Sequence, residues 1–520
     1  MATVVPPPSK RQKTAAAAIT REQQQPQAKP QGDVRLHFVD PATGRSIGPP
    51  IVVPLARANT RNLNILVNSL QGQEDANDRV RYRFVLQADP DAPTGSDQAL
   101  PTDSDLADII GKQAAAGAEA TVTLQPIPEA VFRVKAVSRC SAAISGHGQA
   151  ILAIQFSPVD SSRMVSGSGD NHARIWDCET GTPLATLKGH TGWVGACSYS
   201  PEGDIIATGS QDKTVRLWES KKGKPVGHPM TGHTRNVMAL SWEPYHLQAP
   251  GRPRLASASK DMTVRIWDTT SQRADIVLSG HKACVSCVKW GGTGFIYTAS
   301  HDRTVRVWNA SDGTLAHNLA QHAHWVNHLA LSTDLVLRTA YHDHTGKVPP
   351  TPEAKLAKAK QRFTDAATIA GEVVEKLVTA SDDCTIFLWD PSSTKPTKPL
   401  ARLAGHQKQV NHVSFSPDGL YIASAGFDNH VKLWAARDGK FISTLRGHVA
   451  AVYQCCFSAD SRLLVSASKD TTCKVWDVRS GKLKEDLPGH KDEVYALDWS
   501  ADGERVGSGG KDKQVRIWRH

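Results

Sequence analysis

The chain has 520 residues, of which 40% are hydrophobic and 22% charged, with a formal net charge of +10. This length allows more than one domain, and the composition is that of an ordinary globular protein. No apolar run reaches the ~20 residues of a membrane-spanning helix, and the prolines of "MATVVPPPSKRQK" do not fit the apolar core of a signal peptide. We therefore expect a nuclear or cytosolic protein without membrane contact, whose charge is compatible with nearby nucleic acid.

Residues 1–32 are rich in Pro, Gln, Ala and Lys and contain almost no large apolar residues. Such a segment cannot bury enough surface to offset its ordering entropy, so we predict a disordered tail. Within it, Lys10, Arg11 and Lys13 are either a short nuclear-import signal or ordinary solvated charges. The sequence leaves both interpretations open.

Residues 33–130 predict a small α+β domain. Strand patterns lie at 34–40, 46–55, 79–87 and 119–125, and residues 59–71 place Leu63, Ile65, Leu66 and Leu70 near one helical face. A short capped helix is predicted at 104–112. This order of elements resembles a ubiquitin-like, or β-grasp, domain.

From about residue 140 onward an internal repeat dominates the sequence. Each unit begins with a Gly-His pair, degenerate once to Gln321-His322, and continues to a tryptophan; six of the eight His-to-Trp spacings are 27–29 residues. The tryptophans are Trp176, Trp218, Trp267, Trp308, Trp389, Trp434, Trp476 and Trp518. This is the WD-repeat pattern, and eight units predict an eight-bladed β-propeller over residues 131–520.

Two irregularities in the repeat predict further features. The fifth spacing is 67 residues because of an insertion at about 340–375, whose segment 351–370 looks helical, with Thr351 as cap and Pro352 in the first turn. The chain ends two residues after Trp518, so the last blade has no outer strand of its own. We predict that "RCSAAIS" (139–145) supplies this strand and closes the ring, which removes open sheet edges.

One repeat contains the residue types of a hydrolase triad: His190, Ser210 and Asp212, close to Trp218. However, an Asp stands six residues before the tryptophan in every repeat, and a Ser stands eight before it in six of them. A hydrolase needs one nucleophile in one cleft. We therefore interpret His190, Ser210, Asp212 and Trp218 as structural, in a hydrogen-bond network typical of WD repeats, and predict no catalytic residue and no enzyme activity.

Trp193 and Trp325 each precede a valine expected in the core. This position lies on the top face of WD propellers, where an exposed aromatic ring can anchor a partner. We predict partner binding by both, with packing in the rim as the alternative.

The junction "AVFRVKAVSRCSAAISGH" (130–147) and the segments "HAHWVNHLALSTD" (322–334), "HDHTGKVPPTPEAK" (342–355) and "LPGHKDEVYALDWS" (487–500) are more specific than a generic repeat. In these segments the chain resembles the Notchless family of large-subunit ribosome assembly factors. The resemblance implies a nuclear and nucleolar factor whose propeller docks on the large-subunit pre-ribosome, near its five-S ribonucleoprotein and other assembly factors. Contact with ribosomal RNA is compatible with this role.

The resemblance also implies a second partner, the AAA ATPase Midasin, which grips the ubiquitin-like domain through a metal-ion-dependent adhesion site. An acidic residue just before the last strand of that domain completes the coordination of Mg²⁺ there, and its counterpart in this chain is Glu119. Mg²⁺ is a hard cation that prefers oxygen ligands. The chain alone is then expected to bind no cofactor, and to share Mg²⁺ with its partner.

Two other functions remain as alternatives. "WDVR" (476–479) matches the motif by which some propellers recruit the adaptor of cullin ubiquitin ligases, although its first two residues are also repeat residues. A Notch-signalling adaptor, which the family name suggests, is not separable by sequence.

Overall fold

The computed structural model describes residues 33–39, 46–54, 60–70, 82–86, 98–99, 121–128 and 134–520, the last range without 344–347, 370–371 and 394–395. The predicted tail (1–32), the predicted helix at 104–112 and Glu119 lie outside these residues. The chain divides into two compact units at Val131 and Phe132. No described helix is both long and apolar enough to cross a bilayer.

In its described residues, the N-terminal unit has a five-stranded sheet and one helix. Its described elements are β1 (Asp33–Phe38), β2 (Ile51–Pro54), α2 (Thr60–Leu70), β3 (Tyr82–Leu86), β4 (Gln98–Ala99) and β5 (Thr121–Pro128). The strand order is β2-β1-β5-β3-β4, in which β1 and β5 are parallel and the other pairs are antiparallel. The helix α2 contributes the buried Leu63 and Val67 to the core, whereas Ile65 is 47% exposed. The expected helical face was therefore wrong at Ile65, because residues 63, 67 and 70 follow the helical period and residue 65 does not.

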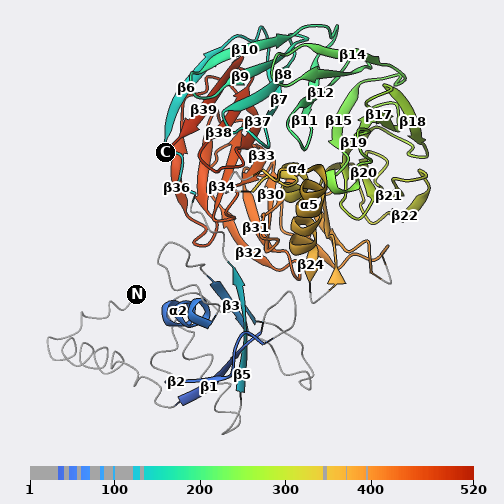
Figure 1. The fold of residues 1–520 in the computed structure, drawn as a ribbon. Coiled ribbons are helices and arrows are strands. Elements are labelled where there is room, and N and C mark those ends of the chain that lie inside the picture. Colours follow the sequence, from blue (N-terminus) through green and yellow to red (C-terminus); the bar gives the residue numbers. More distant parts are fainter. Residues whose placement is uncertain are drawn as a thin grey trace, which may run out of the picture. The chain divides into compact units, whose positions relative to one another are not determined.

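The second unit is mainly β. Its described residues form eight four-stranded antiparallel sheets (Figure 1). The innermost strands are β7 (Ile151–Phe156), β11 (Val194–Tyr199), β15 (Val237–Trp242), β19 (Val285–Trp290), β23 (Val326–Leu331), β29 (Val410–Phe415), β33 (Val452–Phe457) and β37 (Val494–Trp499). Each of them contacts the next, and β37 contacts β7, so the eight sheets are the blades of a closed propeller. We number the blades 1 to 8 in this order.

The other strands of each blade follow outward from the axis. The second strands are β8 (Arg163–Ser168), β12 (Ile205–Ser210), β16 (Arg254–Ser259), β20 (Phe295–Ser300), β26 (Leu377–Ser381), β30 (Tyr421–Gly426), β34 (Leu463–Ser468) and β38 (Val506–Gly510). The third strands are β9 (Ala173–Asp177), β13 (Val215–Glu219), β17 (Val264–Asp268), β21 (Val305–Asn309), β27 (Thr385–Trp389), β31 (Val431–Ala435), β35 (Cys473–Asp477) and β39 (Gln514–Arg519). The outermost strands are β10 (Thr182–Leu187), β14 (Pro225–Met230), β18 (Arg273–Leu278), β22 (Leu315–Leu319), β28 (Ala401–Ala404), β32 (Phe441–Leu445), β36 (Leu483–Leu487) and β6 (Arg139–Ser145).

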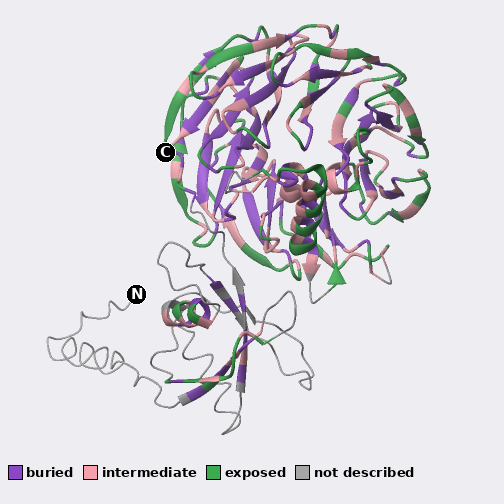
Figure 2. Cartoon of the chain, in the orientation of Figure 1, coloured by how far each residue is buried: buried purple, intermediate pink, exposed green. Residues whose placement is uncertain are grey.

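Burial follows this order of strands. The second strands are almost wholly buried, whereas most residues of the outermost strands are exposed or half-buried, as the colours of Figure 2 show. The repeat tryptophans lie on the third strands and are at most 4% exposed. The hydrophobic clusters between the blades combine residues of two neighbouring blades, which is why one repeat cannot form a core alone.

The predicted ring closure is confirmed. The strand β6 pairs antiparallel with β39, from Arg139 opposite Arg519 to Ser145 opposite Gln514. The residues before it also belong to the propeller, because Val134 and Val137 are buried in a cluster with Trp499. The first and last segments of this unit are thus joined in one blade.

The insertion in blade 5 contains α4 (Asp334–Thr339), α5 (Pro352–Ala367), β24 (Thr368–Ile369) and β25 (Glu372–Val373), and a short 3-10 helix, η2 (Tyr245–Leu247), lies beside α5. The prediction for α5 is confirmed: the side chain of Thr351 accepts a hydrogen bond from the Ala354 N–H at 3.2 Å, and Pro352 begins the helix. Its Phe363 stacks on His246 with ring centroids 4.8 Å apart. Phe363 also lies in a buried cluster with Tyr297 of blade 4, so the helix is fixed against blades 3 and 4.

The shorter helix α4 was not predicted, and it lies toward the middle of the ring (Figure 1). The Arg338 guanidinium pairs with Asp498 on β37, with N–O distances of 2.5 and 2.8 Å, and donates to the Phe156 carbonyl at the end of β7. At the start of α4, Asp334 pairs with Lys289 on β19 at 3.2 Å. These contacts link blade 5 to its neighbour, blade 4, and also to blades 8 and 1 across the ring.

Candidate interaction surface

The supposed triad is a structural network, and its hydroxyl group comes from Thr208 rather than Ser210. His190 lies 2.7 Å from Asp212 through Nδ1 and 2.8 Å from the Thr208 hydroxyl through Nε2. The Trp218 indole N–H donates to the same hydroxyl at 2.8 Å. Because a carboxylate only accepts, Nδ1 carries the proton, and Nε2 accepts from Thr208.

Ser210 has a different role. Its hydroxyl donates to the Gly192 carbonyl at 2.8 Å and accepts from the Asp212 N–H at 3.1 Å. It therefore ties the turn after β12 to the Gly-His loop and does not contact His190. The prediction that Ser210 is structural agrees with these contacts, but its expected place in the network was wrong.

All eight described blades repeat the arrangement around Thr208. In each, the histidine Nε2 lies 2.7–2.8 Å from a hydroxyl oxygen, and the tryptophan N–H donates to that oxygen at 2.7–3.0 Å. The hydroxyl groups belong to Ser166, Thr208, Ser257, Thr298, Thr379, Ser424, Ser466 and Ser508. This position, ten residues before the tryptophan, is Ser or Thr in every repeat, whereas two repeats have Gly at the position eight before it. A hydroxyl that is present in every repeat indicates the position that belongs to the network, so the sequence did contain the signal for Thr208.

The aspartate of the network remains charged at neutral pH. Burial alone would raise the pKa of Asp212, but hydrogen bonds from His190 and Thr214 outweigh it and hold the pKa well below its usual range. The carboxylate also accepts from the Thr191 N–H at 3.0 Å, which fixes the Gly-His loop. Its lone pairs are engaged in structural hydrogen bonds, and the same is true in the other blades.

We expect Thr208→Val to lower the free energy of unfolding by about 2–3 kcal/mol, because it leaves the His190 Nε2 and the Trp218 N–H buried without a partner. Ser210→Ala removes bonds to half-exposed backbone groups and should cost about 1 kcal/mol. Urea unfolding followed by tryptophan fluorescence measures both. A larger loss for Ser210→Ala would contradict the assigned network.

Trp193 and Trp325 are exposed, as predicted, at 47% and 48%, although Val194 and Val326 beside them are fully buried. Each ring leans toward the preceding blade. The Trp325 ring stacks on His301 of blade 4, with centroids 4.6 Å apart and planes 8° from parallel. The Trp193 ring lies over Gly169 of blade 1, where an added Cβ would be 3.6 Å from its Cδ2. Their role in partner binding stays a prediction.

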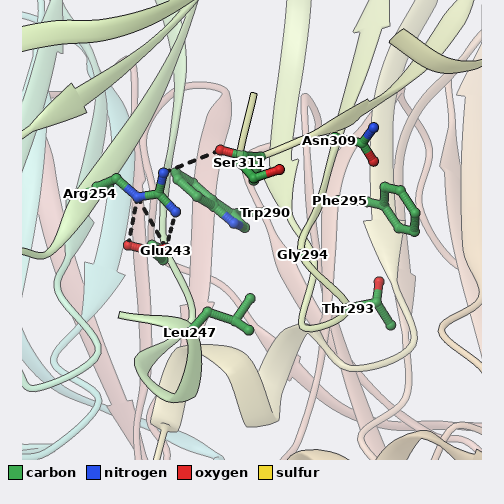
Figure 3. Close-up of a pocket in the computed structure, with 10 residues that line it drawn as sticks. Glu243, Leu247, Arg254, Trp290, Thr293, Gly294, Phe295, Asn309 and Ser311 are labelled. Atoms are coloured by element: carbon green, nitrogen blue, oxygen red, sulfur yellow. Dashed lines mark hydrogen bonds and ion pairs between the residues drawn. The ribbon is translucent and has the colours of Figure 1, made fainter. Parts of the chain in front are cut away.

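A pocket between blades 3 and 4 has an ion pair in its lining (Figure 3). Its carboxylate, Glu243, is held by Arg254 with N–O distances of 3.1 and 3.2 Å, and the guanidinium lies 5.1 Å from the centre of the Trp290 ring. The charged groups of this pocket therefore neutralise each other.

No three His, Cys, Asp or Glu side chains among the described residues lie close enough to hold a metal ion. Glu119, the predicted ligand of a Mg²⁺ held by a partner, lies outside these residues. In the "WDVR" segment, Trp476 is buried and bonded to Ser466, and Asp477 accepts from the Ser480 N–H at 2.8 Å. Both residues thus have structural roles.

The closed ring and its repeated network define a WD-repeat β-propeller. A sequence model of the family "WD domain, G-beta repeat" matches seven segments, at residues 138–177, 181–219, 223–268, 274–309, 397–435, 439–477 and 481–519. None of these segments covers residues 310–396, which contain β23, the insertion, β26 and β27 of blade 5. Among solved structures, the computationally designed Ika8 protein is 25% identical with a TM-score of 0.57, over 74% of this chain and 100% of that chain.

Relatives match most of the chain. Ribosome assembly protein 4 of Chaetomium thermophilum is 56% identical, over 79% of this chain and 78% of that protein. Ribosome assembly protein 4 of Saccharomyces cerevisiae is 52% identical, over 81% and 80%, and Protein Notchless of Drosophila melanogaster is 41% identical, over 72% and 73%. The chain belongs to the family of ribosome assembly protein 4 and Notchless.

Proposed function

We propose that the chain is a non-catalytic assembly factor of the large ribosomal subunit that acts in the nucleus and nucleolus. The observation that carries this proposal is the identity of 52–56% to two proteins named ribosome assembly protein 4 over about four fifths of the chain. The propeller docks on the pre-ribosome near its five-S ribonucleoprotein and other assembly factors. Trp193 supplies an exposed apolar anchor for such contacts.

The N-terminal unit is proposed to be a ubiquitin-like domain. The order β2-β1-β5-β3-β4, with β1 and β5 parallel at the centre and the helix α2 packed against the sheet, supports this assignment. In the proposed complex, Midasin grips this domain through a metal-ion-dependent adhesion site. Glu119 stands two residues before β5 and supplies the carboxylate that completes the coordination of the Mg²⁺ held by Midasin.

The attachment of the propeller suits a chain that transmits force. The Val134 N–H donates to Asp460 at 2.9 Å, Arg462 donates to the Val134 carbonyl at 3.0 Å, and the Ser138 N–H donates to the Arg519 carbonyl at 2.8 Å. The segment that follows the N-terminal unit is thus fixed to blades 7 and 8. A pull exerted by Midasin on the ubiquitin-like domain would reach the whole ring, and with it the bound particle.

Glu119→Asp is expected to reduce Midasin binding severely, because a carboxylate retracted by about 1 Å no longer meets the strict geometry of Mg²⁺. The measurement is the affinity of the full chain for the adhesion-site domain of Midasin with Mg²⁺ and with EDTA. Glu129→Asp, another acid of the same segment, serves as the matched control and should bind like wild type. Wild-type affinity for Glu119→Asp in Mg²⁺ would remove Glu119 from this role.

A further inference from the structure

The loops that surround Trp325 carry exposed cations. Lys260 follows the second strand of blade 3, Lys282 lies in the Gly-His loop of blade 4, and Arg303 lies in the next turn of that blade; all three side chains are exposed. Lys260 and His324 are electrostatic neighbours of His301, on which Trp325 stacks. We call these six residues, with His301, His324 and Trp325 included, the Trp325 surface.

The acidic residues beside this surface are already engaged. Asp302 accepts from the Lys282 N–H at 2.9 Å and lies 2.8 Å from His281, within the structural network of blade 4. Asp382 accepts from Asn327 at 2.6 Å and lies 3.6 Å from His324. Neither side chain is exposed. The charged groups that project freely from these loops are therefore cationic.

The stack leaves a flat aromatic ring accessible. The His301 ring stacks nearly parallel on the Trp325 ring. The centroid of the His324 ring lies 5.4 Å from that of Trp325, with the two planes at 46°. With 48% of its surface exposed, the indole can accept a second ring. Aromatic platforms of this kind, flanked by cations, suit unpaired bases joined by phosphates.

We propose that the Trp325 surface binds single-stranded RNA, with a base stacked on Trp325 and the flanking phosphates near Lys260, Lys282 and Arg303. The inference deepens the proposed function and rests on it for the choice of RNA over an acidic peptide. The parallel ring stack also favours RNA, because every nucleotide offers both a flat ring and a negative charge, whereas an acidic peptide offers only the charge.

The test measures binding of the full chain to a fluorescein-labelled single-stranded RNA of about 12 nucleotides, a length within the range of single-strand binding sites. Trp325→Ala should weaken binding about 5- to 100-fold, the loss of one base stack, while Trp325→Phe should stay within about threefold of wild type. Phe441→Ala is the control, since this aromatic ring is 53% exposed but lies on β32, the outermost strand of blade 6, and outside the Trp325 surface. It should change the affinity less than about twofold.

Salt dependence provides a second readout. Lys260→Gln and Arg303→Gln should each reduce the slope of log affinity against log salt by about 0.7, as expected for one lost phosphate contact to a single strand. Unchanged RNA affinity of Trp325→Ala would overturn the proposal. So would a polyglutamate peptide that binds as tightly as the RNA and loses as much affinity in the same variant. If Trp325→Ala leaves the RNA affinity unchanged but the tagged chain still recovers pre-ribosomes, only this inference fails and the proposed function stands.

Discussion

Asp498→Ala is expected to lower the free energy of unfolding by about 3–5 kcal/mol, the cost of leaving one partner of a buried ion pair alone. Asp498 is 9% exposed at its side chain, and its carboxylate is the anionic partner of Arg338 from the opposite part of the ring. It also accepts from the Phe156 N–H at 2.7 Å. The substitution therefore leaves a guanidinium and a backbone donor without their acceptor. Chemical unfolding with matched fluorescence and circular dichroism measures the loss.

Two further variants separate the charge from the hydrogen bond. Asp498→Asn keeps an acceptor for Phe156 and should cost less than the alanine variant. Adding Arg338→Met to Asp498→Asn removes the unpaired charge and should recover much of the loss, since a buried pair replaced as a whole is often nearly neutral. If Asp498→Ala costs less than about 1 kcal/mol, α4 does not hold the blades together.

Removing the strand β6 should have an even larger effect. A chain that begins at residue 146 loses the buried side chains of Val134, Val137 and Ile144, each of which contributes about 1.5–3 kcal/mol. The sum approaches the total stability of many domains, about 5–15 kcal/mol. The edge of β39 would also become free to pair with other chains, so we expect unfolding and aggregation.

The control is a chain that begins at Phe132, the first residue of the propeller unit. It retains β6 and should show nearly the same urea midpoint as the full chain. Equal midpoints for the two shortened chains would contradict the role of β6 in closing the ring.

The propeller could be predicted from sequence because most repeats have their histidine, aspartate and tryptophan at nearly fixed spacings. The position of each tryptophan after its histidine located the third strand of each blade, and the missing last strand pointed to residues 139–145. Thr351 and Pro352 likewise marked the start of α5, because capping is a local interaction. Such signals depend on neighbours in the chain.

The contacts that were missed depend on residues far apart in the sequence. Arg338 and Asp498 are 160 positions apart, and no local pattern connects them. The exchange of Ser210 for Thr208 in the network has another cause. The two hydroxyl groups stand two residues apart on the same strand, so they share a face and the alternation of side chains does not distinguish them. Only their positions along the strand decide that Thr208 meets His190, whereas Ser210 meets the Gly192 carbonyl.

The candidate surface combines predicted and unpredicted parts. The position of Trp325 before a core valine predicted its exposure, but its support by His301 needed the packing of blade 4 against blade 5. Glu119 was identified by resemblance alone, and its role in metal coordination remains a prediction for the binding assay described above.

Purification of the tagged full chain from nuclear extract, with identification of the bound RNA and proteins, tests the proposed role most directly. We expect precursors of the large ribosomal subunit with the five-S ribonucleoprotein and Midasin, and for Glu119→Asp the same particles without Midasin. Recovery of a cullin and its adaptor, or of Notch-pathway proteins, without ribosomal precursors would contradict the account.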